Sequence, residues 1–224
     1  MTGAWRCVIV FACFLWGTRL MSSDSPNNHA EQFCITEGRI TRAEGKMLRV
    51  DSTKMRAVLG WTGKPEAELR FRYLGETQDH SLLRSGAERT QLGLKLKAQD
   101  DCNVLYVMWR VSPVSGLVVS VKSNPGQHRH AECGNSGYTN IRSALSKPVP
   151  KITEGSEHSL HATLNGTSLS VDVDGALAWA GNVGDDVLRF DGPEGLRSDN
   201  AQFDFQFFAH PASGTFACDK NRTE

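Results

Sequence analysis

The chain has 224 residues, with 25 basic and 25 acidic side chains, and 39% of its residues are apolar. This composition supplies enough apolar material for one globular core. Because the net charge is zero, the chain as a whole lacks the positive excess by which proteins bind nucleic acids or anionic membranes, and no nucleic-acid partner is expected.

An apolar run at 7–16 follows Arg6 near the N-terminus. About ten apolar residues are too few to span a bilayer comfortably, but they are typical of the core of a secretory signal peptide. We therefore predict a signal peptide over 1–23 and a secreted, periplasmic or extracellular protein. The alternative is an uncleaved signal anchor, because Leu20 and Met21 are larger than the small residues usual before a cleavage site. Only in that case would the chain be attached to a membrane.

A polar linker is expected over 24–34, and the chain over 35–210 largely alternates between apolar and polar residues. Such alternation is typical of antiparallel strands with one buried and one solvated face. The clearest apolar faces are Leu69, Phe71 and Tyr73, then Leu92, Leu94 and Leu96, and finally Phe203, Phe205 and Phe207. The run at 103–111 is apolar at nearly every position, which predicts a central strand covered on both faces.

Turn sequences separate the predicted strands. The pairs Asn165-Gly166 and Asp174-Gly175 lie between alternating segments. Both pairs favour type I′ turns, whose positive φ angles suit Asn, Asp and Gly. The segment 158–180 is therefore predicted to be a three-stranded meander.

The fold class follows from the number of short strands. Many antiparallel strands in about 180 residues predict an all-β fold, a two-sheet antiparallel β-sandwich or jelly roll. Modest helical candidates occur only near 80–90 and 142–147.

Four cysteines follow the predicted signal peptide: Cys34, Cys102, Cys133 and Cys218. An even number of cysteines in an exported chain predicts two disulfides, and three pairings are possible. The hairpin after strand 103–111 brings the following loop level with Cys102, which favours Cys102–Cys133. Cys34 and Cys218 flank the core near the two termini, and the first and last strands of sandwiches are often neighbours, which favours Cys34–Cys218.

The chain after the sandwich, residues 211–224, is expected to be a C-terminal tail. It contains the N-glycosylation sequon at Asn221, and a second sequon lies at Asn165. The two sequons are used only if the source organism glycosylates its exported proteins.

A set of glycines, apolar residues and turn residues in 158–181 and 192–209 has a familiar spacing. The positions are Gly166, Val171, Val173, Asp174, Gly175, Gly192, Gly195, Leu196, Asn200, Phe203 and Phe205. This pattern resembles the concanavalin A-like lectin/glucanase superfamily, most closely its laminin-G-like domains and the domains related to 3-keto-disaccharide hydrolases. The resemblance implies a jelly-roll sandwich. It does not select a function, because the superfamily includes glycosidases, lectins and protein-binding modules.

The carboxylates do not match the glucanases of this superfamily. Those enzymes carry paired acidic residues in an E-x-D-x-x-E strand, and this chain has no E-x-D sequence. Its nearest approach, Glu66 and Glu68, is predicted to begin a strand. The sequence SVDVDG at 170–175 resembles a calcium loop, but Gly181 stands where an EF-hand needs glutamate. No cofactor is therefore predicted, and calcium or zinc stays an open alternative.

The polar faces of three predicted strands carry Arg70 and Arg72, Lys95 and Lys97, and residues near 202–206. If these strands share a sheet, they form a mostly basic surface that suits the hydroxyls, carboxylates or sulfates of a glycan. The alternative is a solvated outer face, which is common in antiparallel sheets.

The sequence SNPGQHRHAECGNSGY at 123–138 gathers residue types that bind metals or catalyse proton transfer. In an extended segment, His128, His130 and Glu132 would share one side and could hold a metal or act in catalysis. Cys133 is assigned to a disulfide instead. A ligand-contacting loop without metal is the alternative, in which Asn124 and Tyr138 hydrogen-bond to a sugar or stack on it.

These observations favour an exported, non-catalytic domain that binds a carbohydrate or a glycosylated partner. A glycoside-acting enzyme that uses the 123–138 loop is the first alternative. A structural adhesion or interaction module is the second.

Overall fold

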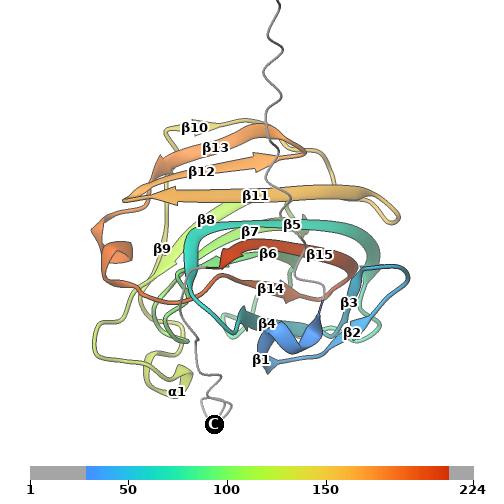
Figure 1. The fold of residues 1–224 in the computed structure, drawn as a ribbon, viewed down its shortest axis with the longest axis horizontal. Helices are drawn as coiled ribbons and strands as arrows, with labels where there is room; N and C mark the ends of the chain where they lie inside the picture. The colour runs from blue at the N-terminus through green and yellow to red at the C-terminus, as the bar shows by residue number, and fades with distance from the viewer. Residues whose placement is uncertain (1–28, 212–224) are drawn as a thin grey trace, which may run out of the picture.

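The structure, a computed structural model, describes residues 29–211 and consists of two antiparallel sheets packed face to face (Figure 1). Sheet A contains, in spatial order, β1 (Phe33–Glu37), β4 (Lys54–Leu59), β14 (Gly195–Asp199), β6 (Thr90–Leu96), β7 (Val104–Ser112), β8 (Gly116–Lys122) and β9 (Tyr138–Asn140). Sheet B contains β10 (Leu145–Ser146), β13 (Ala176–Asn182), β12 (Ser168–Val173), β11 (Glu157–Asn165), β5 (Gly63–Glu76), β15 (Ala201–Pro211), β3 (Leu48–Asp51) and β2 (Ile40–Arg42). Three short helices, η1 (Ala30–Gln32), α1 (His130–Cys133) and η2 (Asp185–Arg189), complete the described fold. The predicted all-β sandwich is confirmed.

The core lies between the two sheets and is built from the apolar faces that the alternation predicted. All nine residues of the three predicted faces are buried. Phe71 packs edge-on against Trp109 with ring centroids 5.9 Å apart, and Phe33 packs in the same way against Phe207 at 5.6 Å. Burial of one such side chain stabilises the fold by roughly 1.5–3 kcal/mol. These inter-sheet contacts fix which face of each strand points inward.

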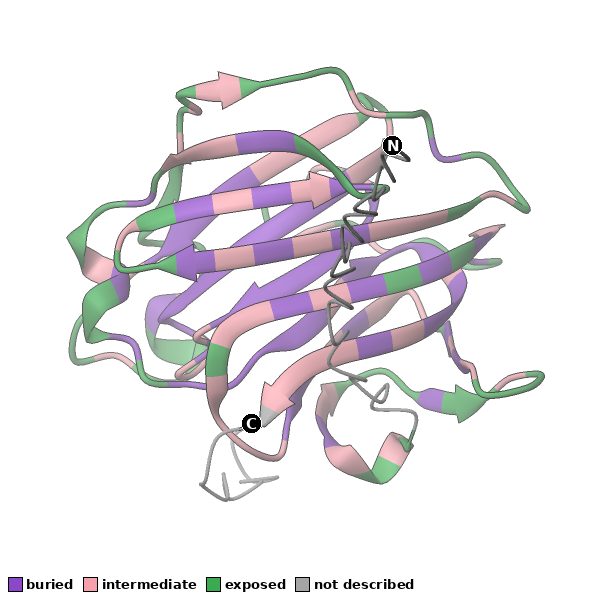
Figure 2. Cartoon of the chain, turned by 45° about the horizontal axis from the view of Figure 1, so that its top comes forward, coloured by how far each residue is buried: buried purple, intermediate pink, exposed green. Residues whose placement is uncertain are grey.

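The two sheets differ in how their outer faces are covered. Buried and less buried residues alternate along the strands of sheet B (Figure 2), whereas every residue of β6 in sheet A is buried. The strand β7, predicted to be central, lies between β6 and β8 and is buried on both faces from Val104 to Trp109. The outer face of β6 and β7 is therefore shielded by neighbouring parts of the chain.

The predicted meander is present as β11, β12 and β13. Its second turn uses Asp174 and Gly175, with φ angles of 51° and 77°, as a type I′ turn requires. Its first turn differs from the prediction. Asn165 still pairs with Ser168, so the turn residues are Gly166 and Thr167, and only Gly166 has positive φ. That pattern is typical of a type II′ turn, whose first residue is glycine.

The two helical candidates are wrong. Residues 142–147 contribute the edge strand β10, which pairs with β13, and residues 80–89 form an irregular segment over sheet A. Between residues 29 and 211, the structure contains no helix with the length and apolar character needed to cross a membrane. The predicted signal peptide, the cysteine at 218 and the sequon at 221 all lie outside the described residues and stay predictions.

Candidate functional site

A groove of about 910 Å³ lies on the outer face of sheet A. Its floor is made by β4, β14, β6, β7 and β8, and its walls are made by residues 82–85 on one side and by the α1 region on the other. Strand alternation creates the floor. Along β6, Leu92 and Leu94 point into the core, so Gln91 and Lys95 point into the groove, where they are only 4% and 6% exposed.

One wall is held in place by Asn200, which occupies the turn between β14 and β15 with a φ of 53°. Its side-chain oxygen accepts a hydrogen bond from the backbone of Ser81 at 2.8 Å. Its side-chain nitrogen donates to the carbonyls of Ser81 and Arg89 at 2.9 and 3.1 Å. Satisfied buried hydrogen bonds of this kind give a segment without secondary structure a defined position. The wall at 82–85 is therefore anchored at both of its ends.

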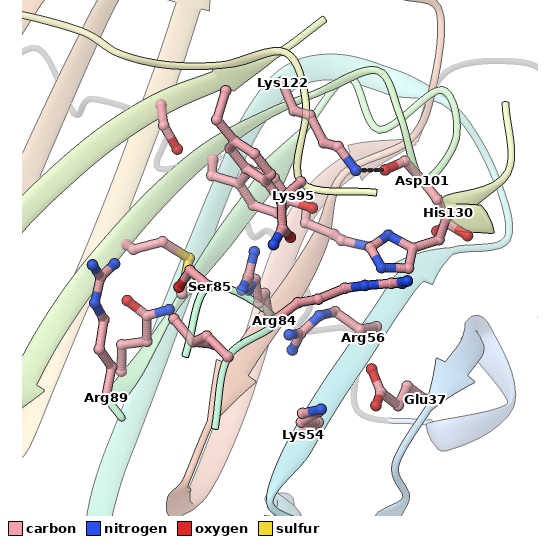
Figure 3. Close-up of a pocket in the computed structure, with 18 of the residues that line it drawn as sticks. Glu37, Lys54, Arg56, Arg84, Ser85, Arg89, Lys95, Asp101, Lys122 and His130 are labelled. Atoms are coloured by element: carbon pink, nitrogen blue, oxygen red, sulfur yellow. Dashed lines mark hydrogen bonds between the residues drawn. The ribbon is translucent and has the colours of Figure 1, made fainter. Parts of the chain in front are cut away.

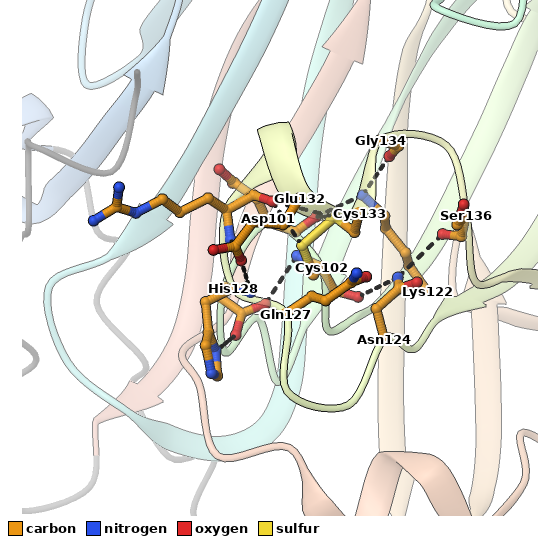
Figure 4. The surroundings of a disulfide bond; sticks show 12 residues. Asp101, Cys102, Lys122, Asn124, Gln127, His128, Glu132, Cys133, Gly134 and Ser136 are labelled. Atoms are coloured by element: carbon orange, nitrogen blue, oxygen red, sulfur yellow. Dashed lines mark hydrogen bonds and ion pairs between the residues drawn. A yellow bond between two sulfur atoms is a disulfide. The ribbon is translucent and has the colours of Figure 1, made fainter.

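The other wall is held by a disulfide between Cys102 and Cys133, whose Cα atoms are 5.9 Å apart (Figure 4). This bridge was predicted and is confirmed. Beside it, the Nζ atom of Lys122 donates to the carbonyls of Asp101 and Gly134 at 2.8 and 2.9 Å. The disulfide and this lysine together fix the 123–138 loop against the end of sheet A.

Asn124 is also part of that anchorage. It is buried, its backbone N–H donates to Asn103 Oδ1, and its amide donates to the carbonyls of Cys102 and Ser136. Its side chain is thus occupied in the loop and is absent from the groove lining.

The predicted common face of His128, His130 and Glu132 does not form, because the chain turns into the short helix α1 at His130. His128 Nδ1 lies 2.8 Å from the carboxylate of Asp100, outside the groove lining. Glu132 accepts hydrogen bonds from the backbone N–H groups of His128 and Arg129, which lower its pKa. Only His130 of the three lines the groove. The described residues contain no group of three or more His, Cys, Asp or Glu placed to hold a metal ion.

The groove lining is strongly basic. Among the described residues, its charged side chains are Lys54, Arg56, Arg84, Arg89, Lys95, Arg110, Lys122 and Arg197, against Glu37 and Asp101. Figure 3 shows Lys95, Arg84 and His130 pointing into the same space. Burial lowers the pKa of His130, and Lys122 and Arg84 lower it further, so the imidazole is neutral at pH 7.

One carboxylate beneath the floor partly balances this charge. Asp199 is 1% exposed and pairs with Arg56 at 2.5 Å and with Arg197 at 3.1 Å. It also accepts a hydrogen bond from Gln91 at 2.7 Å. Burial raises the pKa of Asp199, but the two arginines outweigh burial and the pKa is lowered overall. Asp199 is therefore ionised and fully engaged.

Lys95 differs from these paired groups. No hydrogen bond or ion pair to its ammonium is found within residues 29–211. Burial, together with the charges of Arg56 and Arg197, lowers the pKa of Lys95 to about 8. The ammonium of this largely buried side chain faces the groove, so groove water or a bound anion must solvate its charge.

Two tyrosines give the groove an aromatic wall. Tyr106 and Tyr138 stack with ring centroids 6.1 Å apart, and Tyr138 is 42% exposed. Arg197 lies 5.0 Å from the centroid of Tyr106, and Lys122 lies 5.3 Å from that of Tyr138. Cation–π contacts of this kind orient the rings while leaving part of Tyr138 open to solvent.

The remaining predicted ligand-binding residues lie elsewhere. Arg70 and Arg72 are on β5, on the outer face of sheet B, where they pair with Glu68 and Glu157 at 2.7 Å. Lys97 follows β6 and donates to the carbonyl of Val187 at 2.7 Å. The structure thus places Lys95, His130 and Tyr138 in one groove and separates them from the other predicted residues.

Sequence reasoning missed most of the basic groove. Lys54 and Arg56 alternate with the buried Met55 and Ala57 along β4. That alternation was visible in the sequence, but it does not say which sheet the strand joins. Arg84 and Arg89 lie in an irregular segment for which no periodic signal exists.

No protein-family model matches the sequence, and no curated protein matches it. Solved structures match its fold. The carbohydrate binding module CBM66 from Bacillus subtilis is 13% identical, with 80% of this chain and 96% of that chain covered and a TM-score of 0.55. A putative glycosyl hydrolase from Parabacteroides distasonis is 9% identical over 81% of this chain and 89% of that chain, with a TM-score of 0.49. Galectin LEC-6 from Caenorhabditis elegans is 9% identical over 80% of this chain and 95% of that chain, with a TM-score of 0.40. The chain has the two-sheet jelly-roll fold that its sequence pattern implied.

Proposed function

We propose that the protein is an exported, non-catalytic domain that binds a carbohydrate in the groove of sheet A. The observation that carries this proposal is the pairing of a partly exposed aromatic wall with a polar floor. Tyr138 presents a ring face that suits the C–H face of a sugar, and the floor offers donors and acceptors such as Gln91 and Ser120 for its hydroxyls.

The fold supports this proposal. The solved structure with a TM-score of 0.55 is a carbohydrate binding module, and 96% of it is covered. A shared fold alone does not assign a function. It supports carbohydrate binding here because the groove of this chain has an aromatic ring and polar groups that suit a sugar, an observation that does not depend on the fold comparison. The Cys102–Cys133 disulfide agrees with an oxidising, extracytoplasmic location, where a glycan partner is found.

The carboxylates favour binding over hydrolysis. A glycosidase needs two carboxyl groups flanking the scissile bond, and the acid has a raised pKa. Burial raises the pKa of Glu194 to about 8, but Glu194 is not part of the groove lining. Asp199 is buried beneath the floor and engaged by two arginines. The described lining offers Glu37 and Asp101 among eight basic side chains, which is a poor setting for an acid that must hold its proton.

A glycan array tests the proposal, followed by titration calorimetry on the glycans that bind. Tyr138→Ala should weaken binding about 2- to 10-fold, since aromatic contacts of this kind contribute ~0.5–1.5 kcal/mol. Leu177→Ala is the matched control, because Leu177 is similarly exposed at 37% but lies on β13 of sheet B. Binding should survive a chelator, and bound glycans should be recovered intact. Absence of binding across the array, cleavage of the glycan, or equal affinity of the Tyr138 variant would contradict the proposal.

A further inference from the structure

The charge of the molecule is distributed unevenly. Eight of the 25 basic residues line the groove, together with two of the 25 acidic residues. The rest of the chain therefore holds 17 basic and 23 acidic residues and is net negative. A neutral protein has thus concentrated its positive charge in one concave site, where walls of lower polarizability strengthen the field.

Lys95 is at the centre of this charge. It is 6% exposed, lines the groove, and has no hydrogen-bonding or ion-pair partner in the part of the chain that the structure describes. Arg197 lies on the adjacent strand β14, opposite Gly93, which is two residues from Lys95 on β6. Gly93 places no side chain between Lys95 and Gln91, and a Cβ at this position would collide with the backbone of Val107 and Met108 on β7.

The local charge is only partly neutralised from within. Asp199 is the one carboxylate shared by Arg56 and Arg197, and the carboxylates whose charges act on Lys95 are Asp101 and Glu37, neither of which forms an ion pair with it in the described residues. A buried, unpaired cation is unfavourable unless an anion binds beside it. The groove therefore offers cations whose charge a negatively charged group from outside would neutralise.

We propose that the ligand of the groove is an acidic glycan, and that a carboxylate or sulfate group of this glycan binds Lys95 and Arg197. This inference rests on the proposed carbohydrate-binding function and names the class of ligand. Both anions present oxygen acceptors that match an ammonium and a guanidinium. The neighbouring Tyr138 then contacts the sugar ring that carries the anionic group.

A second cation extends the site along the groove. Arg110 on β7 is opposite Gln91, whereas Lys95 is opposite Tyr106, four residues away along the same strand. At ~3.4 Å per residue, the backbone positions of the two residues are roughly 14 Å apart along the strand direction. The Nε atom of Arg110 is buried and has no partner among the described residues. This spacing suits an oligosaccharide with repeated acidic groups better than a single acidic sugar.

The chemistry favours a glycan over a nucleic acid. A nucleic acid binds across a broad basic surface, with affinity dominated by many phosphate contacts. Here the positive charge is enclosed between two anchored walls, and the remaining chain is net negative and repels a long polyanion.

Calorimetry with chemically matched ligands tests the inference. A sulfated polysaccharide is compared with its desulfated form, and a uronate polysaccharide is compared with its carboxyl-reduced form. Removal of the acidic group should weaken binding about 10- to 100-fold, as expected for charged hydrogen bonds. The pair with the larger loss identifies the group, sulfate or carboxylate. Equal binding of the neutral forms would overturn this inference while leaving carbohydrate binding intact. Failure of every glycan to bind would overturn both, and tighter binding of single-stranded DNA would assign the groove to nucleic acid.

Variants distinguish the site from nonspecific charge. Lys95→Met should weaken binding of the acidic glycan about 10- to 100-fold without lowering the melting temperature, because it removes a buried unpaired charge. Arg70→Ala removes a cation from the outer face of sheet B and should leave affinity unchanged. Arg110→Gln tests the other end of the groove and should weaken binding of the acidic glycan about tenfold. It also replaces Lys95→Met as the test if that variant does not fold. Unchanged affinity in the folded groove variants would overturn the proposal.

Discussion

The outer faces of the two sheets carry similar charged residues in different arrangements. On sheet B, three arginines have a carboxylate beside them: Arg49 with Asp204, Arg70 with Glu68, and Arg72 with Glu157, at 2.6–2.7 Å. On sheet A, Lys54, Arg84, Arg89, Lys95 and Arg110 have no ion pair within the described residues, and Arg56 and Arg197 share one aspartate. The arginines of sheet B are paired within the fold, whereas most cations over sheet A are open to a ligand.

Burial makes the contrast stronger. Arg70 has a side-chain exposure of 54%, so water already solvates its charge, whereas Arg197 has an exposure of 13%. An exposed ion pair adds little to stability, because water screens it and two long side chains lose entropy. A buried charge depends on its partner. The same charged residue types therefore contribute differently to stability and to binding on the two sheets, depending on how deeply each outer face is buried.

Asp199→Asn tests this contrast with the largest expected effect. It removes the carboxylate that Arg56 and Arg197 share, leaving two largely buried guanidinium groups without their ion pair. The free energy of unfolding should fall by about 3–5 kcal/mol. Urea denaturation followed by tryptophan fluorescence measures it.

Its matched control is Glu157→Gln, which removes the partner of the exposed Arg72 on sheet B and should leave the unfolding curve in place. Equal destabilisation by the two substitutions would show that the faces do not differ in the way proposed. The pH dependence gives a second check. Because the folded pKa of Asp199 is lowered, its stabilising contribution is present above pH ~4 and is lost as the pH falls further.

Much of the fold could be predicted from the sequence, since local patterns encode it. Period-two alternation identified the inward face of β5, β6 and β15, and the Asp174-Gly175 pair identified a turn. The Cys102–Cys133 bridge followed from the hairpin that brings the loop back to the start of β7.

The groove could not be predicted, because strand order in space is not a local property. Arg72 and Lys95 lie at equivalent outward positions of alternating strands, but β5 joins sheet B and β6 joins sheet A. The wall at 82–85 depends on Asn200, more than 100 residues away in the chain. His128, His130 and Glu132 were predicted to share one side because they are spaced by two residues in a segment expected to be extended. They do not share a side, because the chain forms the short helix α1 from His130.

The pH dependence of glycan affinity tests the charge state of Lys95, and the expected change is of intermediate size. The groups whose charges act on it are Arg56 on β4, Arg197 on β14, Glu37 on β1 and Asp101 before β7. With a folded pKa of about 8, Lys95 is charged at pH 7 and largely neutral above pH 9. Affinity for a sulfated glycan should therefore fall about tenfold between pH 7 and 9.5, measured by calorimetry, since sulfate itself does not titrate there.

Stability of the unliganded protein should change in the opposite direction. Between pH ~8 and ~10.5 the unfolded chain holds the proton on Lys95 and the folded chain does not, so the free energy of unfolding rises with pH. Burial also lowers the pKa of Lys122 to about 8, and that group bonds to backbone carbonyls at the wall. Lys95→Arg separates the two lysines, because arginine stays charged throughout. A pH profile unchanged by Lys95→Arg would assign the effect to Lys122.

The smallest effect is expected on sheet B, and it decides whether that face is inert. Glu68→Gln breaks the pair with Arg70, which lies on the same strand and also packs 4.3 Å from the ring centroid of Phe208. The free energy of unfolding should fall by less than about 1 kcal/mol, and the loss should shrink in high salt because exposed charges are screened. Affinity for an acidic glycan should not change. If freeing Arg70 from its carboxylate instead strengthened glycan binding, the outer face of sheet B would be a second site that internal pairing normally keeps closed.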